Sequence, residues 1–239
     1  ATPTGETLGV AQWAHSAVWT ERMLATLQTG VKGGKWHTLI DKVYDQRNLL
    51  AAVRKVLGKE GAAGVDRQTV GDFGQNWQEE LARLQQQLRD DEYRPAAVRR
   101  VLIPKPGSSE KRPLGIPTVR DRVVQTALVH VIEPILDNEF HPRSFGFRHG
   151  RGCRDALQCV EERLQAGYVY VVDADLKSYF DTIPKDRLLA MVAAKISDSR
   201  VLQLIERYLH QSILEELREW TPDKGVPQGA VLSPVLANL

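Results

Sequence analysis

The chain has 239 residues, 42% of them hydrophobic, and a formal net charge of +2. This apolar content is enough to bury a core, which excludes a disordered or fibrous chain. No apolar run reaches the roughly 18 residues that cross a bilayer, so we expect no membrane span. Cys153 and Cys159 form neither a zinc-binding C-x-x-C pair nor a disulfide scaffold. The N-terminal segment lacks the layout of a secretory signal, and we expect a cytoplasmic protein.

The charge is distributed unevenly along the chain. From Arg94 to Arg154 there are twelve Lys and Arg residues against five Asp and Glu residues, a net charge of +7, so the remainder carries −5. A basic block in a nearly neutral protein predicts a face that binds a polyanion such as nucleic acid. An ordinary solvated surface explains the same composition about as well.

The first third of the chain has the periodicity of amphipathic helices. Apolar residues recur every three or four positions over 7–28, 40–57 and 73–90, and each range is predicted to be a helix. Glycines at 58, 61 and 64 separate the second helix from the third.

The pattern changes at Pro95. Residues 98–104 and 112–117 are predicted strands, and Pro106-Gly107-Ser108-Ser109 between them is a strong turn signal, so the pair predicts a β hairpin. A helix over 119–138, a loop rich in Gly, Arg and aromatic residues over 143–152, and a helix over 153–166 are expected to follow.

The last third contains the run with the highest strand propensity. Tyr168-Val-Tyr-Val-Val172 consists of β-branched and aromatic residues and predicts a strand. Helices are expected over 185–195 and 199–211, and a second hairpin over 212–225 with 222–225 at or near its tip. The apolar helix that begins at 232 stops at the last residue, which is typical of a fragment.

Two acidic residues follow directly on the predicted strand. Asp173 and Asp175 lie at its carboxyl end, and Phe180 and Asp181 come five and six residues after Asp175. Such a carboxylate is well placed to hold Mg²⁺, which prefers oxygen ligands. The alternative is that Asp175 only caps the turn that follows.

Three further segments carry residues suited to binding. The segment Gly225-Val-Pro-Gln-Gly229 offers the hydrogen-bonding amide of Gln228 and, at Gly229, a backbone that a ligand can approach closely. Lys105 and Arg112 on the first hairpin could clamp a polyphosphate. The 143–152 loop suits RNA through stacking and phosphate contacts. Each segment also has a purely structural interpretation. The segment 225–229 could be an ordinary loop that enters a helix, and the first hairpin could end in an exposed charged tip. The 143–152 loop could be held to the core by Phe145 and Phe147.

The order of these segments resembles that of the reverse transcriptases: a basic hairpin, an Arg/aromatic loop, a strand ending in D-x-D-L-K-x-x-F-D, and V-P-Q-G-x-x-x-S-P. Further segments are similar to the group II intron-encoded reverse transcriptases, or maturases, of bacteria and organelles, and these are 61–66, 112–117, 144–148 and 236–238. Residues 61–66 match a block that viral enzymes lack. The resemblance covers nearly the whole chain.

This resemblance implies an α+β fingers–palm fold with a helical N-terminal extension and antiparallel β hairpins. Residues 1–93 would form the extension and the start of the fingers, 94–166 the fingers, and 167–239 the first part of the palm.

The resemblance also implies roles for individual residues. Asp175 and the backbone carbonyl of Leu176 would help hold two Mg²⁺ ions, which activate the primer 3′-hydroxyl and stabilise the leaving pyrophosphate. Phe180 matches the aromatic residue under the incoming sugar, where a flat ring leaves no room for a 2′-hydroxyl. Lys105 and Arg112 would hold the triphosphate.

The remaining implied roles concern the nucleotide loop and RNA. Gln228 and Gly229 match the loop that packs against the nucleotide, whereas Asp173 is expected to support structure. The RNA contacts would come from the 143–152 loop, through Arg143, Arg148 and Arg151.

The implied function is that of an RNA-directed DNA polymerase of a group II intron-type element. Its partners would be an RNA template, intron RNA, a DNA primer and dNTPs, in a ribonucleoprotein of the bacterial cytoplasm. The family's second acidic block, Tyr/Phe-Ala-Asp-Asp, is not in this sequence, so we expect a fragment that binds RNA but holds no ordered metal. The alternatives are a retron, CRISPR-associated or diversity-generating reverse transcriptase, and a non-catalytic RNA-binding splicing factor.

Overall fold

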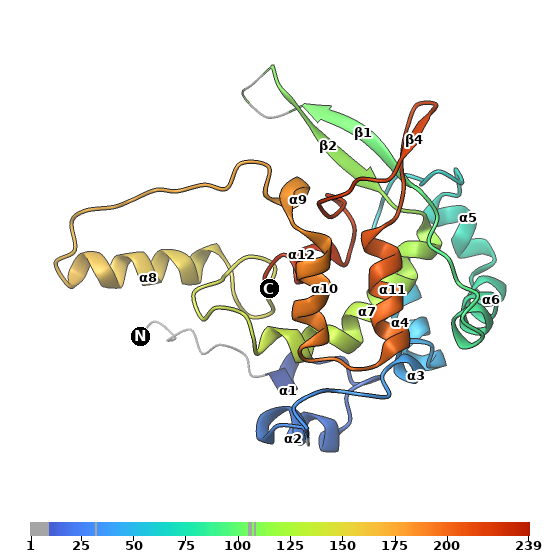
Figure 1. The fold of residues 1–239 in the computed structure, drawn as a ribbon, viewed down its shortest axis with the longest axis horizontal. Helices are drawn as coiled ribbons and strands as arrows, with labels where there is room; N and C mark the ends of the chain where they lie inside the picture. Colours follow the sequence, from blue (N-terminus) through green and yellow to red (C-terminus); the bar gives the residue numbers. More distant parts are fainter. Residues whose placement is uncertain (1–9, 32, 105–106, 108) are drawn as a thin grey trace.

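The computed structural model describes residues 10–31, 33–104, 107 and 109–239. A helical body lies below a small sheet, and one arm extends away from that body (Figure 1). None of the described helices combines the length and apolar character that a membrane crossing requires.

The N-terminal region is helical, as predicted, but its helices are shorter and more numerous. Their bounds are α1 (Val10–Trp13), α2 (Glu21–Thr29), α3 (Ile40–Val43), α4 (Gln46–Leu57), α5 (Val70–Gln75) and α6 (Trp77–Arg89).

The prediction of a single helix over 7–28 is wrong, because a non-helical segment separates α1 from α2. The hydroxyl of Thr20 accepts a hydrogen bond from the Met23 amide and caps the start of α2. The indole of buried Trp19 donates to the His130 carbonyl oxygen at 2.9 Å. The non-helical segment between α1 and α2 therefore places the Trp19 side chain in the core.

One long helix forms the centre of the body. Helix α7 (Val119–Asp137) begins at Thr118, whose hydroxyl accepts from the Asp121 amide, and is buried on nearly all sides. A helix that is buried all round is expected at the middle of a core. Helices α10 (Lys185–Ala193) and α11 (Ser199–Leu209) complete the body. The carboxylate of Asp198 caps α11 and also accepts from the Leu39 amide at 2.6 Å, which ties the N-terminal region to it.

The two predicted hairpins join into one sheet. Strands β1 (Val98–Pro104), β2 (Lys111–Ile116), β3 (Ile213–Glu215) and β4 (Arg218–Trp220) lie in the order β2-β1-β3-β4. Strands β1 and β3 run parallel, whereas both hairpins are antiparallel. The second hairpin turns at 216–217 and not at 222–225, because Glu216 adopts a left-handed conformation and reverses the chain there.

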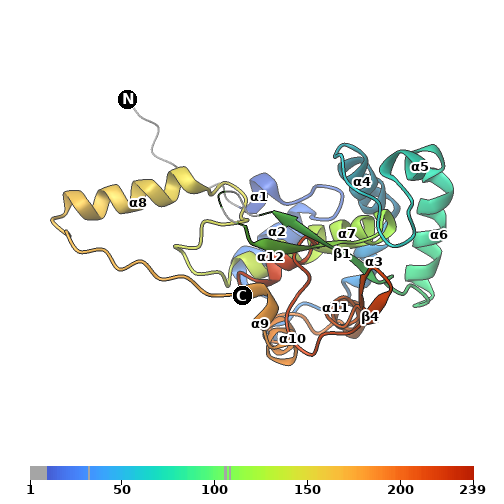
Figure 2. The ribbon, with the colours of Figure 1, turned by 90° about the horizontal axis from the view of Figure 1, so that it is seen from above.

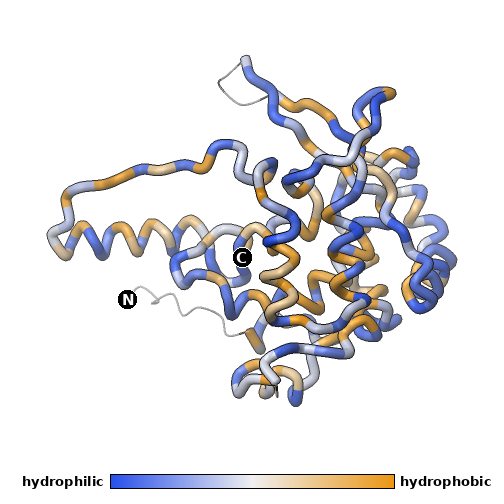
Figure 3. Tube along the Cα trace, viewed as in Figure 1, coloured by the Kyte–Doolittle hydropathy of each residue, from blue (hydrophilic) through white to orange (hydrophobic). Residues whose placement is uncertain are grey.

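The strand predicted over 168–172 is wrong: these residues are extended but unpaired. Together with α8 (Cys153–Gln165) they form the arm seen in Figures 1 and 2. Tyr170 is 95% exposed, and Figure 3 shows an apolar stretch along the arm. High strand propensity reflects packing against neighbouring strands, and none of the described strands lies beside this segment. Helix α8 itself has no buried residue.

The C-terminal part contains two short helices, α9 (Tyr179–Thr182) and α12 (Ser233–Leu236). The helix predicted from 232 to 239 is thus only one turn long. The Tyr179 hydroxyl donates to the Ala237 carbonyl oxygen at 2.7 Å, which holds the end of the chain against α9. One hydrophobic core includes residues of the ranges 1–93, 94–166 and 167–239, and the division into these ranges stays a prediction.

Candidate nucleotide and metal site

The Pro-Gln-Gly loop meets strand β2 through the backbone. The Gly115 amide donates to the Gln228 carbonyl oxygen at 2.6 Å. Gly229 has φ +103°, and a Cβ there would overlap the Gly115 carbonyl oxygen and lie 2.9 Å from Leu114 Cδ1. Only glycine fits this conformation and this contact.

The same loop is anchored on its other side by the central helix. The Leu232 amide donates to Oε1 of buried Gln125, from α7, at 3.1 Å. The Ser233 hydroxyl donates to the Pro227 carbonyl oxygen at 2.8 Å and closes the loop on itself. The loop is therefore fixed between β2 and the core before any ligand binds.

The fold brings Phe180 against this loop, although Phe180 lies 48 positions before Gln228 in the sequence. The Val226 amide donates to the Phe180 carbonyl oxygen at 2.8 Å. Nε2 of Gln228 lies 3.4 Å from Oδ2 of Asp181, the residue next to Phe180. Gly225 makes the close approach possible, since a Cβ at this φ of +87° would lie 2.8 Å from the Phe180 carbonyl oxygen.

The Phe180 ring is half-buried against the core and packs edge to face with Tyr179, with ring centroids 5.7 Å apart. Ser178 precedes the pair with φ +52°, which turns the chain from the arm into α9. The position of the aromatic ring is therefore set by packing on both sides.

Asp175 and Leu176 lie on the exposed arm, and the structure does not place them in a formed site. Leu176 is 69% exposed. Among the described residues, no three His, Cys, Asp or Glu side chains gather where they could hold a metal ion. One carboxylate on an unpaired segment does not supply the oxygen ligands that two Mg²⁺ ions need. The described donor set therefore does not fit a complete two-metal centre.

Of the two residues predicted to bind the triphosphate, the structure describes Arg112 but not Lys105. Arg112 lies exposed on β2, opposite Ile103 of β1. Lys105 lies outside the described residues. The hairpin that carries both was predicted correctly in its strands.

The 143–152 loop uses two of its three arginines for its own structure. The Arg148 side chain is 4% exposed and forms a bidentate ion pair with Asp137, at 2.8 and 3.0 Å. Arg151 donates to the Pro142 carbonyl oxygen. Arg143 is exposed. Phe147 is 69% exposed and does not hold the loop to the core, contrary to the alternative that assigned it that role.

The contacts that hold the 61–66 loop were not predicted from the sequence. Two arginines bind its carbonyl oxygens: Arg99 contacts that of Ala63 at 2.6 and 2.9 Å, and Arg122 contacts that of Ala62. A Cβ at Gly64 would lie 2.7 Å from the backbone of Thr118, so this glycine allows the loop to pack on the start of α7. Successive residues of a strand point to opposite faces, so the pair Arg99 and Arg100 indicated that one arginine lies on each face of the first predicted strand.

Comparisons with known proteins agree with this arrangement. A family model described as reverse transcriptase (RNA-dependent DNA polymerase) matches residues 103–239. Protein YkfC of Escherichia coli is 34% identical over 92% of this chain and 59% of its own length. The group II intron-encoded protein LtrA of Lactococcus lactis is 35% identical over 79% of this chain and 31% of its own.

Two further similarities support the same family and fold. A protein in a cob intron of Schizosaccharomyces pombe is 40% identical over 66% of this chain and 20% of its own length. A chain of a Cas6-RT-Cas1–Cas2 complex has the same fold, with a TM-score of 0.56, 24% identity and coverage of 84% of this chain and 33% of that one. This chain thus spans about three fifths of YkfC and about a third of LtrA. It belongs to the reverse transcriptase family and is of the group II intron-encoded type.

Proposed function

We propose that this chain is the nucleotide-binding part of an RNA-directed DNA polymerase. The observation that carries the proposal is the junction of Gln228 and Phe180 beneath β2, held by the Gly115 amide and the Val226 amide. Residues from three distant parts of the sequence meet there, and the surrounding packing fixes them in advance. Such preorganisation is what a site that positions a reacting nucleotide needs.

Each residue at the junction has a role in this proposal. The Phe180 ring lies under the sugar of the incoming dNTP, and Gln228 and Gly229 line its other side. Arg112 binds the triphosphate as a fork of hydrogen-bond donors, with Lys105 as a second cation.

Metal binding needs more than the described residues. Asp175 and the Leu176 carbonyl would hold Mg²⁺ together with carboxylates from a neighbouring strand, which is not among the described strands. The ions would supply the positive charge that stabilises the transferring phosphate. The exposed arm supports this proposal, because pairing of 168–172 with such a strand would bury its apolar residues.

RNA binding is proposed for the basic block. LtrA and the cob intron protein are named as intron-encoded proteins, and we infer that this chain takes part in binding an RNA template and intron RNA in a cytoplasmic ribonucleoprotein. Arg143 is the arginine of the 143–152 loop that is exposed to a ligand, whereas Arg148 is engaged by Asp137. The DNA primer and dNTP complete the partners.

A CRISPR-associated reverse transcriptase is the second candidate. It is supported by the fold shared with a chain of the Cas6-RT-Cas1–Cas2 complex. An identity of 24% shows that the fold is shared and nothing more. A non-catalytic RNA-binding splicing factor is the third.

Primer extension on an RNA template tests the proposal. The protein is a longer polypeptide that contains this chain and supplies the remaining carboxylates. We expect DNA synthesis that is abolished by Asp175→Asn and retained by Asp186→Asn, a change at an exposed acid of α10. Synthesis that survives Asp175→Asn would reject the proposed role of Asp175. RNA binding without any synthesis would favour the splicing factor.

A further inference from the structure

A cavity of about 240 Å³ lies between the sheet and the start of α10. Apolar residues form much of its wall, among them Val98, Leu209, Ile213 and Val226. Polar side chains enter it at a few points, and these are Arg100, Asp181, Lys185, Gln211, Lys224 and Gln228. An apolar cavity with a few polar groups is the usual form of a small-ligand site.

This cavity adjoins the candidate nucleotide site. Gly115, Asp181, Val226 and Gln228 border both, whereas Phe180 and Arg112 do not line the cavity. Pro113 and Gly115 of β2 line the cavity. Successive residues of a strand point to opposite faces, so Arg112 lies on the other face of β2. Likewise Arg100 lines the cavity, whereas Arg99 of the same strand binds the 61–66 loop on the opposite face.

A buried cation lies at the wall of the cavity. Lys185 is 3% exposed, and its ammonium donates to the Pro222 carbonyl oxygen. No ion pair between described residues includes Lys185, and Asp223 acts on it only at longer range. Burial lowers the pKa of Lys185. A buried charge without a close counter-charge is costly, and an anionic ligand would remove that cost.

The start of α10 adds to this positive potential. Lys185 is the first residue of the helix, and Pro184 at the N-cap has no side chain that could accept a hydrogen bond. The first-turn amides of a helix then remain open to an acceptor, and the helix dipole favours a negative group at that end.

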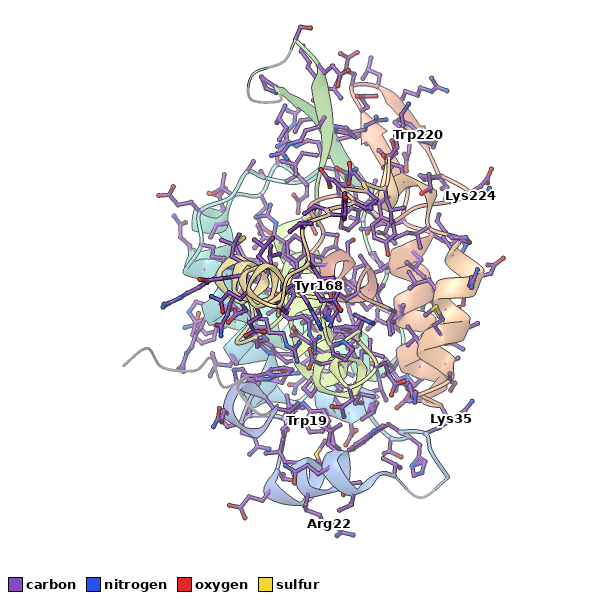
Figure 4. The ribbon with its side chains drawn as sticks, turned by 90° about the vertical axis from the view of Figure 1, so that its left-hand side faces the viewer. Trp19, Arg22, Lys35, Tyr168, Trp220 and Lys224 are labelled. Atoms are coloured by element: carbon purple, nitrogen blue, oxygen red, sulfur yellow. The ribbon has the colours of Figure 1, made fainter. Side chains whose placement is uncertain are left out.

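Flat side chains lie at the side of the cavity formed by the β3–β4 hairpin. The Arg100 guanidinium carbon lies 5.6 Å from the centroid of the Trp220 ring. Trp220 and Lys224 lie on the same side of the molecule in Figure 4. Guanidinium and indole planes stack on nucleobases, and carboxylate and amide groups such as those of Asp181 and Gln228 bond to base edges.

We propose that this cavity binds one nucleotide unit, with its phosphate at Lys185 and its base against Arg100 and Trp220. A volume of about 240 Å³ leaves room for no more than a single nucleotide unit, which excludes a duplex. The unit is either a free mononucleotide or an unpaired residue of a bound RNA, since both present the same phosphate, ribose and base. The proposal does not depend on polymerase activity.

Titration of the full chain with 5′-AMP tests this proposal. The indole N–H resonance of Trp220, identified with Trp220→Phe, reports binding at the cavity, and calorimetry gives the affinity. We expect saturable binding that shifts this resonance, with inorganic phosphate and adenosine each binding more weakly than AMP. No saturable binding, or equal affinities for AMP and phosphate, would overturn the proposal.

Two charge variants locate the phosphate. Lys185→Met should weaken AMP binding by at least about tenfold, because a charge-assisted hydrogen bond is lost. Lys195→Met is the matched control: this lysine follows the same helix but pairs with Glu139 on the surface, and the affinity should not change. If Lys185→Met does not fold, Lys224→Gln takes its place, and the expected loss of AMP affinity is then smaller. Unchanged AMP affinity in the folded variant would overturn the assignment.

A short unstructured oligoadenylate distinguishes the two sources of the ligand. If it displaces AMP and loses the same factor of affinity in Lys185→Met, the nucleotide unit belongs to RNA. If it binds without displacing AMP, the cavity takes a free mononucleotide. Neither arm uses primer extension, so a failure here is distinct from a failure of the proposed polymerase function.

Discussion

The Gly115 amide donates a hydrogen bond to the Gln228 carbonyl oxygen at 2.6 Å, and this bond joins the first hairpin to the Pro-Gln-Gly loop. Gly229 packs against the same stretch of β2. The hairpin that carries Arg112 is therefore connected at its base to the residues that flank Phe180. Displacement of one part should displace the other.

Gly229→Ala tests the close approach of this loop to β2. The new Cβ would overlap the Gly115 carbonyl oxygen at a φ of +103°. We expect a loss of unfolding free energy of about 2 kcal/mol or more, measured by chemical denaturation. The control is Gly34→Ala, which also has a positive φ, of +73°, but no atom within 4 Å of the new Cβ. Its cost should be about 1 kcal/mol. Equal losses would show that the contact with Gly115 contributes nothing.

Arg143 and Arg148 should differ in their contribution to RNA binding. RNA affinity should fall steeply with salt, because bound phosphates release counterions. Arg143→Gln should reduce the slope of log affinity against log salt concentration by about one.

Arg148→Gln serves as the comparison for Arg143→Gln. It breaks the buried pair with Asp137 and should cost about 3 kcal/mol of unfolding free energy instead. Fluorescence anisotropy across a salt series, with thermal unfolding alongside, measures both effects. A salt slope lowered by Arg148→Gln and unchanged by Arg143→Gln in folded proteins would contradict this assignment.

The stability of the chain should fall in mild acid because of His130. Burial, with Lys55 as the next cause, lowers the pKa of His130 from 6.5 to about 3. Its ring stacks on His15 at 4.4 Å and bonds to Asn48 at 2.9 Å. The unfolded chain binds a proton at this group that the folded chain does not. This contribution is therefore present above about pH 6.5 and is lost progressively as the pH falls toward 3.

Denaturation at a series of pH values measures this effect. The loss should be on the order of 2 kcal/mol between about pH 6.5 and pH 5, with Glu133, whose pKa burial raises, acting in the opposite direction. His130→Gln should flatten the pH dependence, whereas replacement of exposed His37 by Gln should not. A slope that His130→Gln leaves intact would assign the effect to another group.

Residues 1–239 alone should neither extend a primer nor bind Mg²⁺ tightly. Asp175 is the predicted metal-binding carboxylate in the sequence, and its segment lacks a neighbouring strand among those described. Calorimetry with Mg²⁺ and a primer-extension assay on an RNA template check this. Extension by the purified chain that is abolished by Asp175→Ala would mean that residues such as Asp173 or Asp181 hold the second ion.

Local sequence patterns predicted the elements that their own residues stabilise. The β1–β2 hairpin follows from alternation and a Pro-Gly turn, and α7 follows from its apolar periodicity. The strand over 168–172 failed because a strand needs a neighbour, which propensity does not report. Arg148 and Arg143 look alike in sequence, and only the fold shows that Asp137 engages one of them. The approach of Asp181 to Gln228 depends on tertiary packing and had no local signal.

Sugar discrimination is the most direct test of the proposed nucleotide site. In the longer polypeptide with an RNA template, steady-state primer extension gives kcat/KM for dNTP and for rNTP. Phe180→Val removes the flat ring from beneath the sugar, so the account predicts that rNTPs become substrates and that the dNTP/rNTP ratio falls by at least about tenfold. A ratio that stays at the value of the unmodified enzyme, with dNTP use intact, would contradict the placement of Phe180 at the sugar.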